Sequence, residues 1–177
     1  MTPKKRKQPR KITRQYLENA ALYYLQRYAS SAGNFRQVMR RKVKRSCDFH
    51  KTEPDEFYPM VDALVERYKS SGLLDDKVFA DARVAALRRQ GRSTGDILAK
   101  LQAKGLARTD IEAALEAHNE ACEAEDPELA AAIRLARRKR LGQAQDPETQ
   151  RKELAKLGRA GFGYETARAA LAELKKE

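Results

Sequence analysis

A repeated helical pattern constrains the fold of this chain more than any other feature of its 177 residues. The pattern Leu-x-x-Leu-x-x-x-Gly begins at Leu98 and again at Leu154, and a further leucine stands ten residues after each glycine, at Leu115 and Leu171. The two copies are therefore 56 residues apart throughout. A looser copy around Val43 precedes them, and its last helix face has an offset of 50 residues. Because units this small cannot bury a good core alone, the repeat predicts three helical units that stack or abut.

Helical periodicity and helix ends indicate the same fold. Apolar residues recur at i, i+3 and i+4, as in Val61, Leu64 and Val65, and no alternating β-branched run is present. Asp126 and Asp146 each precede a proline, which places a capping carboxylate before a first helical turn. Five glycines follow apolar periodic stretches, where helices end in a residue of positive φ: Gly72, Gly91, Gly105, Gly142 and Gly161. We predict an all-α chain.

The composition favours small cores. Leu, Ile, Val and Phe account for only 33 of the 177 residues, whereas Ala accounts for 28, and so few large apolar side chains make one deep core improbable. We divide the chain into a disordered basic arm at 1–12 and three-helix repeats at 13–72, 73–122 and 123–177. An insertion at about 47–57 separates the second and third helices of the first repeat, where Cys47 takes the place of Gly105.

The sequence excludes several classes of protein. No apolar run approaches the roughly 18 residues of a membrane span, and the charged N-terminus lacks the apolar segment of a secretory signal. Two cysteines, Cys47 and Cys122, cannot form a disulfide framework. We therefore expect a cytoplasmic protein that contacts no membrane. We also expect a monomer.

The net charge of +12 comes from two segments. Residues 1–12 contribute +6 and residues 36–51 contribute +6, so the rest of the chain is neutral overall. A positive excess indicates a polyanion or an acidic protein surface as partner. The candidate partner-facing residues form one cluster per repeat: Arg36, Arg40, Arg41, Lys44 and Arg45; Arg88, Arg89 and Arg92; Arg134, Arg137 and Arg138.

Aromatic and ligand-like residues leave alternatives open. Four tyrosines at helical spacing fit either base stacking or the edge of a core, the commoner role: Tyr16, Tyr23, Tyr24 and Tyr28. Cys47-x-x-His50 and His118-x-x-x-Cys122 have ligand-like spacing, but 67 residues separate the pairs and a zinc site needs four ligands together. Since His118 also lies on the apolar face of its predicted helix, we interpret it as structural and predict no metal.

No motif for catalysis is present in the sequence. The glycines at 158, 161 and 163 lack the preceding strand and the Lys-Ser/Thr of a phosphate loop. Asp75 and Asp76 are a carboxylate pair, but their place after Gly72 is typical of a helix N-cap and first turn. We predict neither enzymatic activity nor a cofactor.

The order of these helical motifs resembles the RecX family of bacterial regulatory proteins that act on the RecA recombinase. The resemblance covers about residues 14–174 and is most specific in the middle repeat. Two departures stand out, because the family usually has glycine where Ser93 and Cys47 stand here. The residues that carry the repeat motif are Gly72, Leu73, Leu74, Asp75, Asp76, Phe79, Gly91, Leu101, Gly105, Ile111, Leu115, Leu157, Gly161, Phe162 and Leu171.

The resemblance implies three tandem three-helix repeats in an elongated, curved array, whose hand stays open. It also implies binding to RecA or to the RecA–single-stranded-DNA filament, with reduced strand exchange, ATP hydrolysis and co-protease activity. The alternative is a general nucleic-acid-binding helical module that contacts phosphates of single- or double-stranded DNA directly. A metal-dependent enzyme is the third hypothesis, which zinc analysis of the purified protein would test.

Overall fold

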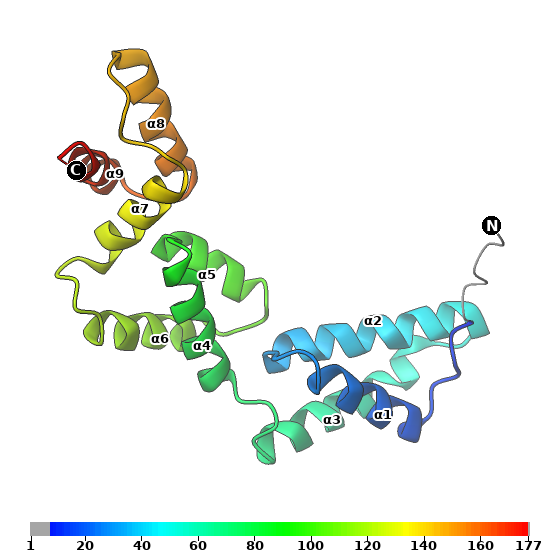
Figure 1. Cartoon of the computed structure of the whole chain (residues 1–177). Coiled ribbons are helices and arrows are strands. Elements are labelled where there is room, and N and C mark those ends of the chain that lie inside the picture. The colour runs from blue at the N-terminus through cyan, green and yellow to red at the C-terminus, as the bar shows by residue number, and fades with distance from the viewer. Residues whose placement is uncertain (1–7, 177) are drawn as a thin grey trace. The chain divides into compact units, whose positions relative to one another are not determined.

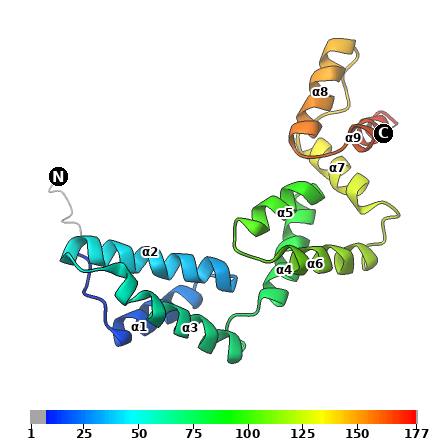
Figure 2. The same ribbon diagram turned by 180° about the vertical axis from the view of Figure 1, so that it is seen from behind.

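The computed structural model describes residues 8–176, and these are folded entirely into helices and connecting turns (Figure 1). Nine α-helices and one short 3₁₀ helix occur in this part of the chain, and it contains no strand. The prediction of an all-α fold is confirmed. The helices form two compact units, which divide between Asp76 and Lys77 (Figure 2).

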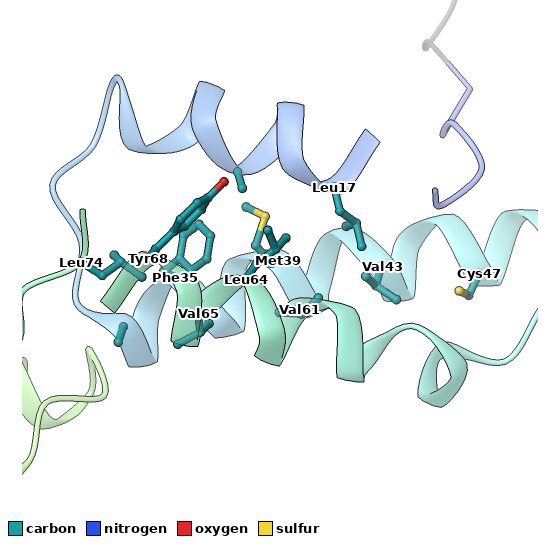
Figure 3. Close-up of a cluster of buried hydrophobic side chains, with 12 residues drawn as sticks. Leu17, Phe35, Met39, Val43, Cys47, Val61, Leu64, Val65, Tyr68 and Leu74 are labelled. Atoms are coloured by element: carbon teal, nitrogen blue, oxygen red, sulfur yellow. The ribbon is translucent and has the colours of Figure 1, made fainter. Parts of the chain in front are cut away.

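The first unit packs two helices and a 3₁₀ turn against one long helix. Its elements are α1 (Arg14–Leu25), α2 (Ala32–His50), η1 (Pro54–Glu56) and α3 (Tyr58–Ser70). Figure 3 shows their apolar side chains directed into one shared layer. Those buried in this core are Leu17, Ala21, Ala32, Phe35, Met39, Val43, Cys47, Val61, Leu64, Val65, Tyr68 and Leu74.

Helix α2 is longer than the repeat alignment predicts. The alignment predicts that Cys47 occupies the helix-ending position of Gly105, and this is wrong: the helix continues to His50. Lys51 adopts the left-handed conformation instead, with φ of 57°, and its N–H donates to the carbonyl of Cys47. Cys47 lies on the apolar face of α2 and packs in the core at 1% exposure, and no glycine stands there to end the helix.

The segment just before α1 contacts the end of α2. Ser46 Oγ donates to the carbonyl of Arg10 at 2.7 Å, and His50 Nε2 lies 2.9 Å from the carbonyl of Pro9. Ile12 packs against the core of the first unit. These last residues of the predicted disordered arm therefore lie on the folded unit, whereas residues 1–7 fall outside the described residues.

The second unit contains six helices around two cores. They are α4 (Asp76–Arg89), α5 (Thr94–Gln102), α6 (Arg108–Glu120), α7 (Pro127–Arg138), α8 (Pro147–Arg159) and α9 (Tyr164–Leu174). The core of α4 to α6 buries Phe79, Ala80, Val84, Ile97, Leu101, Leu106, Ile111, Ala114 and Leu115. The core of α7 to α9 buries Ala131, Ala132, Leu135, Ala136, Leu141, Leu157, Phe162, Ala167, Ala170 and Leu171. Five of these ten residues are alanine, so the last core is thin.

The helix ends predicted from the two Asp-Pro pairs and the five glycines are confirmed. Asp126 caps α7 by accepting from the N–H groups of Glu128 and Leu129, and Asp146 caps α8 by accepting from that of Thr149. All five predicted glycines have positive φ, between 67° and 99°. Because the backbone around these ends depends on local chemistry, short motifs were sufficient to locate them.

Candidate functional site

The basic helix α2 divides into two rows of cations with different surroundings. Arg36 and Arg40 point toward α3, where Asp62 Oδ1 accepts from Arg36 Nε at 2.9 Å and Asp62 Oδ2 accepts from Arg40 Nη2 at 2.8 Å. Arg36 also pairs with Glu66 at 3.5 Å. Lys44 lies 3.6 Å from Asp48 on the same helix. These three candidate residues therefore meet carboxylates of their own unit.

The other row lies over the segment before α1. Arg41, Lys42 and Arg45 line a shallow cavity of about 580 Å³ together with Arg10 and the ring of Tyr16. No carboxylate lines this cavity, and none of its four cations forms an ion pair within the described residues. Of the candidates predicted on α2, Arg41 and Arg45 are thus the ones that keep an exposed charge available to a partner.

The four tyrosines of the first unit have different roles. Tyr24 is at the edge of the core, 6.1 Å from the ring of Phe35, and its hydroxyl accepts from Asn34. Tyr23 is 60% exposed, and the guanidinium of Arg27 lies 3.7 Å above its ring centroid. Tyr16 is half-buried and Tyr28 is exposed. The core-edge interpretation therefore applies to Tyr24 and fails for Tyr23.

Arg88 is not a partner-facing residue, which corrects the prediction. Its side chain is 2% exposed and its Nη1 lies 2.6 Å from Glu128 Oε2 on α7. Its Nη1 also donates to the carbonyl of Arg92, and its Nη2 donates to Thr94 Oγ1. Glu128 additionally accepts from the backbone N–H and hydroxyl of Thr94. The guanidinium is held inside the second unit because it connects α4, the start of α5 and α7.

The other predicted cations of the second unit lie at or near its surface. Arg89 is exposed, and Arg92 is half-buried with its Nη1 3.4 Å from Asp96 Oδ2. Arg134 is exposed and donates to the carbonyl of Arg88 at 3.4 Å. Arg137 and Arg138 are both exposed in the last turn of α7.

His118 lies beside this buried network. The side chain is half-buried. Burial lowers the pKa of His118 below its usual value of 6.5, and the charges of Arg88, Arg134 and Arg89 lower it further. Cys47 is buried and Cys122 half-buried, and both are unpaired. No group of three or more metal-ligating side chains occurs among residues 8–176.

The repeat-motif residues connect helices rather than form a reactive site. Asp76 Oδ1 accepts from the backbone N–H of Ala32 at 2.7 Å, at the N-terminus of α2. Leu74, Phe79, Leu101, Ile111, Leu115, Leu157, Phe162 and Leu171 are buried in the three cores, whereas Leu73 is exposed. Gly72 and Gly105 end α3 and α5 with positive φ.

Two further motif glycines and Ser93 form the contact between α4–α6 and α7–α9. A Cβ on Gly91 would lie 2.7 Å from the backbone N of Leu135. Ser93, which stands where the family usually has glycine, caps α5 and donates from Oγ to the carbonyl of Ala160 at 2.8 Å. A Cβ on Gly161 would lie 2.5 Å from that same Oγ.

Sequence reasoning missed Glu128 and the structural role of Ser93. The signal for Glu128 was its position directly after Asp126-Pro127, in the first turn of a helix, where a carboxylate is favourable. Nothing in the local sequence pointed to Arg88 as its partner, 40 residues away.

Comparisons with known proteins agree with this architecture. The family model for the RecX second three-helix domain matches residues 75–115. The regulatory protein RecX of Myxococcus xanthus is 40% identical to this chain over 168 residues, which covers 92% of this chain and 87% of the relative. This chain belongs to the RecX family. The resemblance predicted from the helical motifs is confirmed.

Other RecX proteins support the assignment. The regulatory protein RecX of Agrobacterium fabrum is 29% identical over 154 residues, covering 85% of this chain and 78% of its own length. The crystal structure of RecX from Lactobacillus salivarius has a TM-score of 0.66 at 20% identity, covering 93% of this chain and 97% of that one. A second RecX crystal structure has a TM-score of 0.62 at 20% identity, covering 93% and 72%. The helical-repeat fold is therefore that of RecX, and the chain has a RecX-type regulatory role.

Proposed function

We propose that this chain binds RecA or the RecA–single-stranded-DNA filament and inhibits its strand exchange, ATP hydrolysis and co-protease activity. The observation that carries the proposal is the 40% identity with a RecX regulatory protein across 92% of the chain. The action is steric and conformational. Binding across adjacent RecA subunits disfavours filament growth or the active state, because a ligand shifts an equilibrium by its preference for one state.

The distribution of charge supports a binding role without chemistry of its own. Both units present exposed arginines, and most apolar residues of the repeat motif are used in cores. We propose that Arg89 and Arg138 of the second unit contact RecA or its DNA, because both are exposed and neither forms an ion pair within the described residues. The protein acts as a monomer and needs no cofactor.

The proposed compartment is the cytoplasm. Both cysteines are unpaired, and one of them is half-buried rather than enclosed, which suits a reducing environment. No helix in residues 8–176 is long and apolar enough to cross a membrane.

A RecA activity assay tests this function. The full chain is titrated into RecA on single-stranded DNA while ATP hydrolysis and co-protease cleavage are measured. We expect both activities to fall as the protein approaches the amount of RecA. Unchanged activities at stoichiometric protein would overturn the proposal.

A pair of charge-reversal variants tests the named arginines. We expect R89E/R138E to require about ten-fold more protein for half inhibition, which corresponds to about 1.4 kcal/mol of binding free energy. The matched control is R168E/K175E, which makes the same change in net charge on exposed positions of α9 and at its end. Equal loss in both variants would show that net charge alone matters, and would remove Arg89 and Arg138 from the interface.

A further inference from the structure

We propose that the first unit carries its own binding site for a single strand of nucleic acid, on the face where α1 and α2 meet the segment before α1. The site consists of the cations Arg10, Lys11, Arg41, Lys42 and Arg45 and the rings of Tyr16 and Tyr23. It goes beyond the RecA-directed function, because it needs no RecA to bind.

The cations of this face lack the partners that neutralise the rest of α2. Asp62 and Glu66 hold Arg36 and Arg40 on the side of α3. On the opposite side, Arg41 and Arg45 are one helical turn apart, and no ion pair with a carboxylate neutralises either within the described residues. Like charges at this spacing cost stability unless an anion lies over them.

Two adjoining cavities extend this positive charge into a continuous track of cations along the surface of the first unit. The first, of about 580 Å³, is lined by Arg10, Tyr16, Arg41, Lys42 and Arg45 among others. The second, of about 520 Å³, shares Arg10, Tyr16 and Lys42 with the first and adds Lys11 and Tyr23. Among the residues that the structure describes, no carboxylate lines either cavity. A phosphodiester backbone fits such a track, since successive phosphates need successive cations.

The aromatic rings distinguish a single strand from a duplex or an acidic protein. Tyr23 is 60% exposed, and Arg27 lies 3.7 Å over its ring centroid. Lys42 Nζ lies 5.5 Å from the ring centroid of Tyr16. Unpaired bases stack on exposed rings beside cations, whereas a duplex keeps its base faces covered and an acidic peptide has none to offer. We assign phosphate contacts to Arg10, Arg41 and Arg45, and base stacking to Tyr23.

Fluorescence anisotropy with labelled dT₂₀ and rU₂₀, in the absence of RecA, tests the site on the full chain. We expect binding of one or both strands, weakening with salt at a slope of about 0.7 per neutralised phosphate. R41Q/R45Q should lower this slope by about 1.4, two contacts at that same value. The matched control is R36Q/R40Q on the same helix, which should leave the slope unchanged because those arginines face α3.

The stacking residue has a separate readout and control. Y23A should weaken binding about ten-fold at every salt concentration without changing the slope, since a ring neutralises no phosphate. Y28A, which removes a ring of nearly equal exposure at 58% outside both cavities, should bind like the wild type. Circular dichroism of each variant confirms that it is folded.

Three results would overturn the proposal. One is the absence of binding to both strands at low salt. Another is equal affinity for a duplex together with no effect of Y23A, which would reduce the site to general phosphate contact. The third is equal loss in R36Q/R40Q and R41Q/R45Q. Since RecA is not present, each result is independent of whether the chain inhibits RecA.

Discussion

At the scale of single residues, the guanidinium of Arg88 stands out as the most deeply buried charged group among residues 8–176. A charge at 2% exposure loses most of its hydration, and only its contacts with Glu128, Thr94 and the carbonyl of Arg92 compensate. Its Nε has no hydrogen-bond partner among the described residues. Such a group favours the observed arrangement of α4, α5 and α7, because moving Glu128 away while Arg88 stays buried would leave a charge without a partner.

We expect R88M to lower the free energy of unfolding of the second unit by about 3 kcal/mol, because it leaves Glu128 partly buried without its cation. Adding E128Q to R88M should cost less than the sum of the two single changes, since the pair is then removed together. Urea unfolding of the four proteins measures this coupling. Additive losses would mean that the two side chains do not depend on each other.

His118 predicts a pH dependence of the same unit. Its folded pKa is lowered, by burial and then by Arg88, Arg134 and Arg89, so the unfolded chain binds a proton first as the pH falls below about 7. The second unit should therefore lose stability from pH 7 toward pH 5, in the direction opposite to that of a histidine with an acidic partner. H118Q should reduce this loss in unfolding experiments at both pH values. An identical pH profile in H118Q would show that other groups cause it.

At the scale of elements, the glycine at a helix end does more than allow a left-handed turn. Gly91 follows α4 with φ of 67°, and its Cα lies against the backbone of α7. Gly72 follows α3 with φ of 73° and has nothing within 4 Å of an added Cβ. The two positions share a backbone conformation and differ in packing. Comparing them therefore separates the strain of a positive φ from the steric clash of an added side chain.

We expect G72A to cost about 1 kcal/mol, the strain of an L-residue in the left-handed region. G91A should cost about 3 kcal/mol, because the new methyl must also displace the backbone of Leu135. Native-state hydrogen exchange measures both, since it reports the stability of each unit separately. Similar costs would indicate that α7 shifts away from Gly91 without penalty.

At the scale of the whole molecule, three small cores are distributed over two compact units. The cores of α4–α6 and α7–α9 belong to one unit, and Arg88, Gly91 and Ser93 connect them. The first unit has a core of its own. Within that unit, its last residue, Asp76, accepts from the backbone N–H of Ala32 at the N-terminus of α2.

This arrangement predicts that a destabilising substitution in one unit leaves the stability of the other unit unchanged. R88M should accelerate hydrogen exchange throughout α4 to α9 and leave α1 to α3 unchanged, because the ion pair lies wholly within the second unit. D76A should instead accelerate exchange at the N-terminus of α2, where the hydrogen bond from Ala32 is lost. Exchange in α9, a helix of the other unit, should change less. Uniform acceleration across the chain in R88M would mean that the two units unfold as one.

The sequence by itself determined the helices, their caps and the positive-φ glycines, because each depends on residues a few positions apart, and it indicated the family through the order of these motifs along the chain. Val61, Asp126 and Gly161 carry that information locally. Tertiary structure alone decided which cations are free to bind a partner, since the carboxylates that neutralise the others come from distant positions in the chain. Asp62 is 26 residues from Arg36, and Glu128 is 40 residues from Arg88. The basic helix α2 thus has one row of arginines paired with carboxylates of α3 and one row without such partners. Arg88, which the sequence places at the surface, is instead buried where α4, α5 and α7 meet.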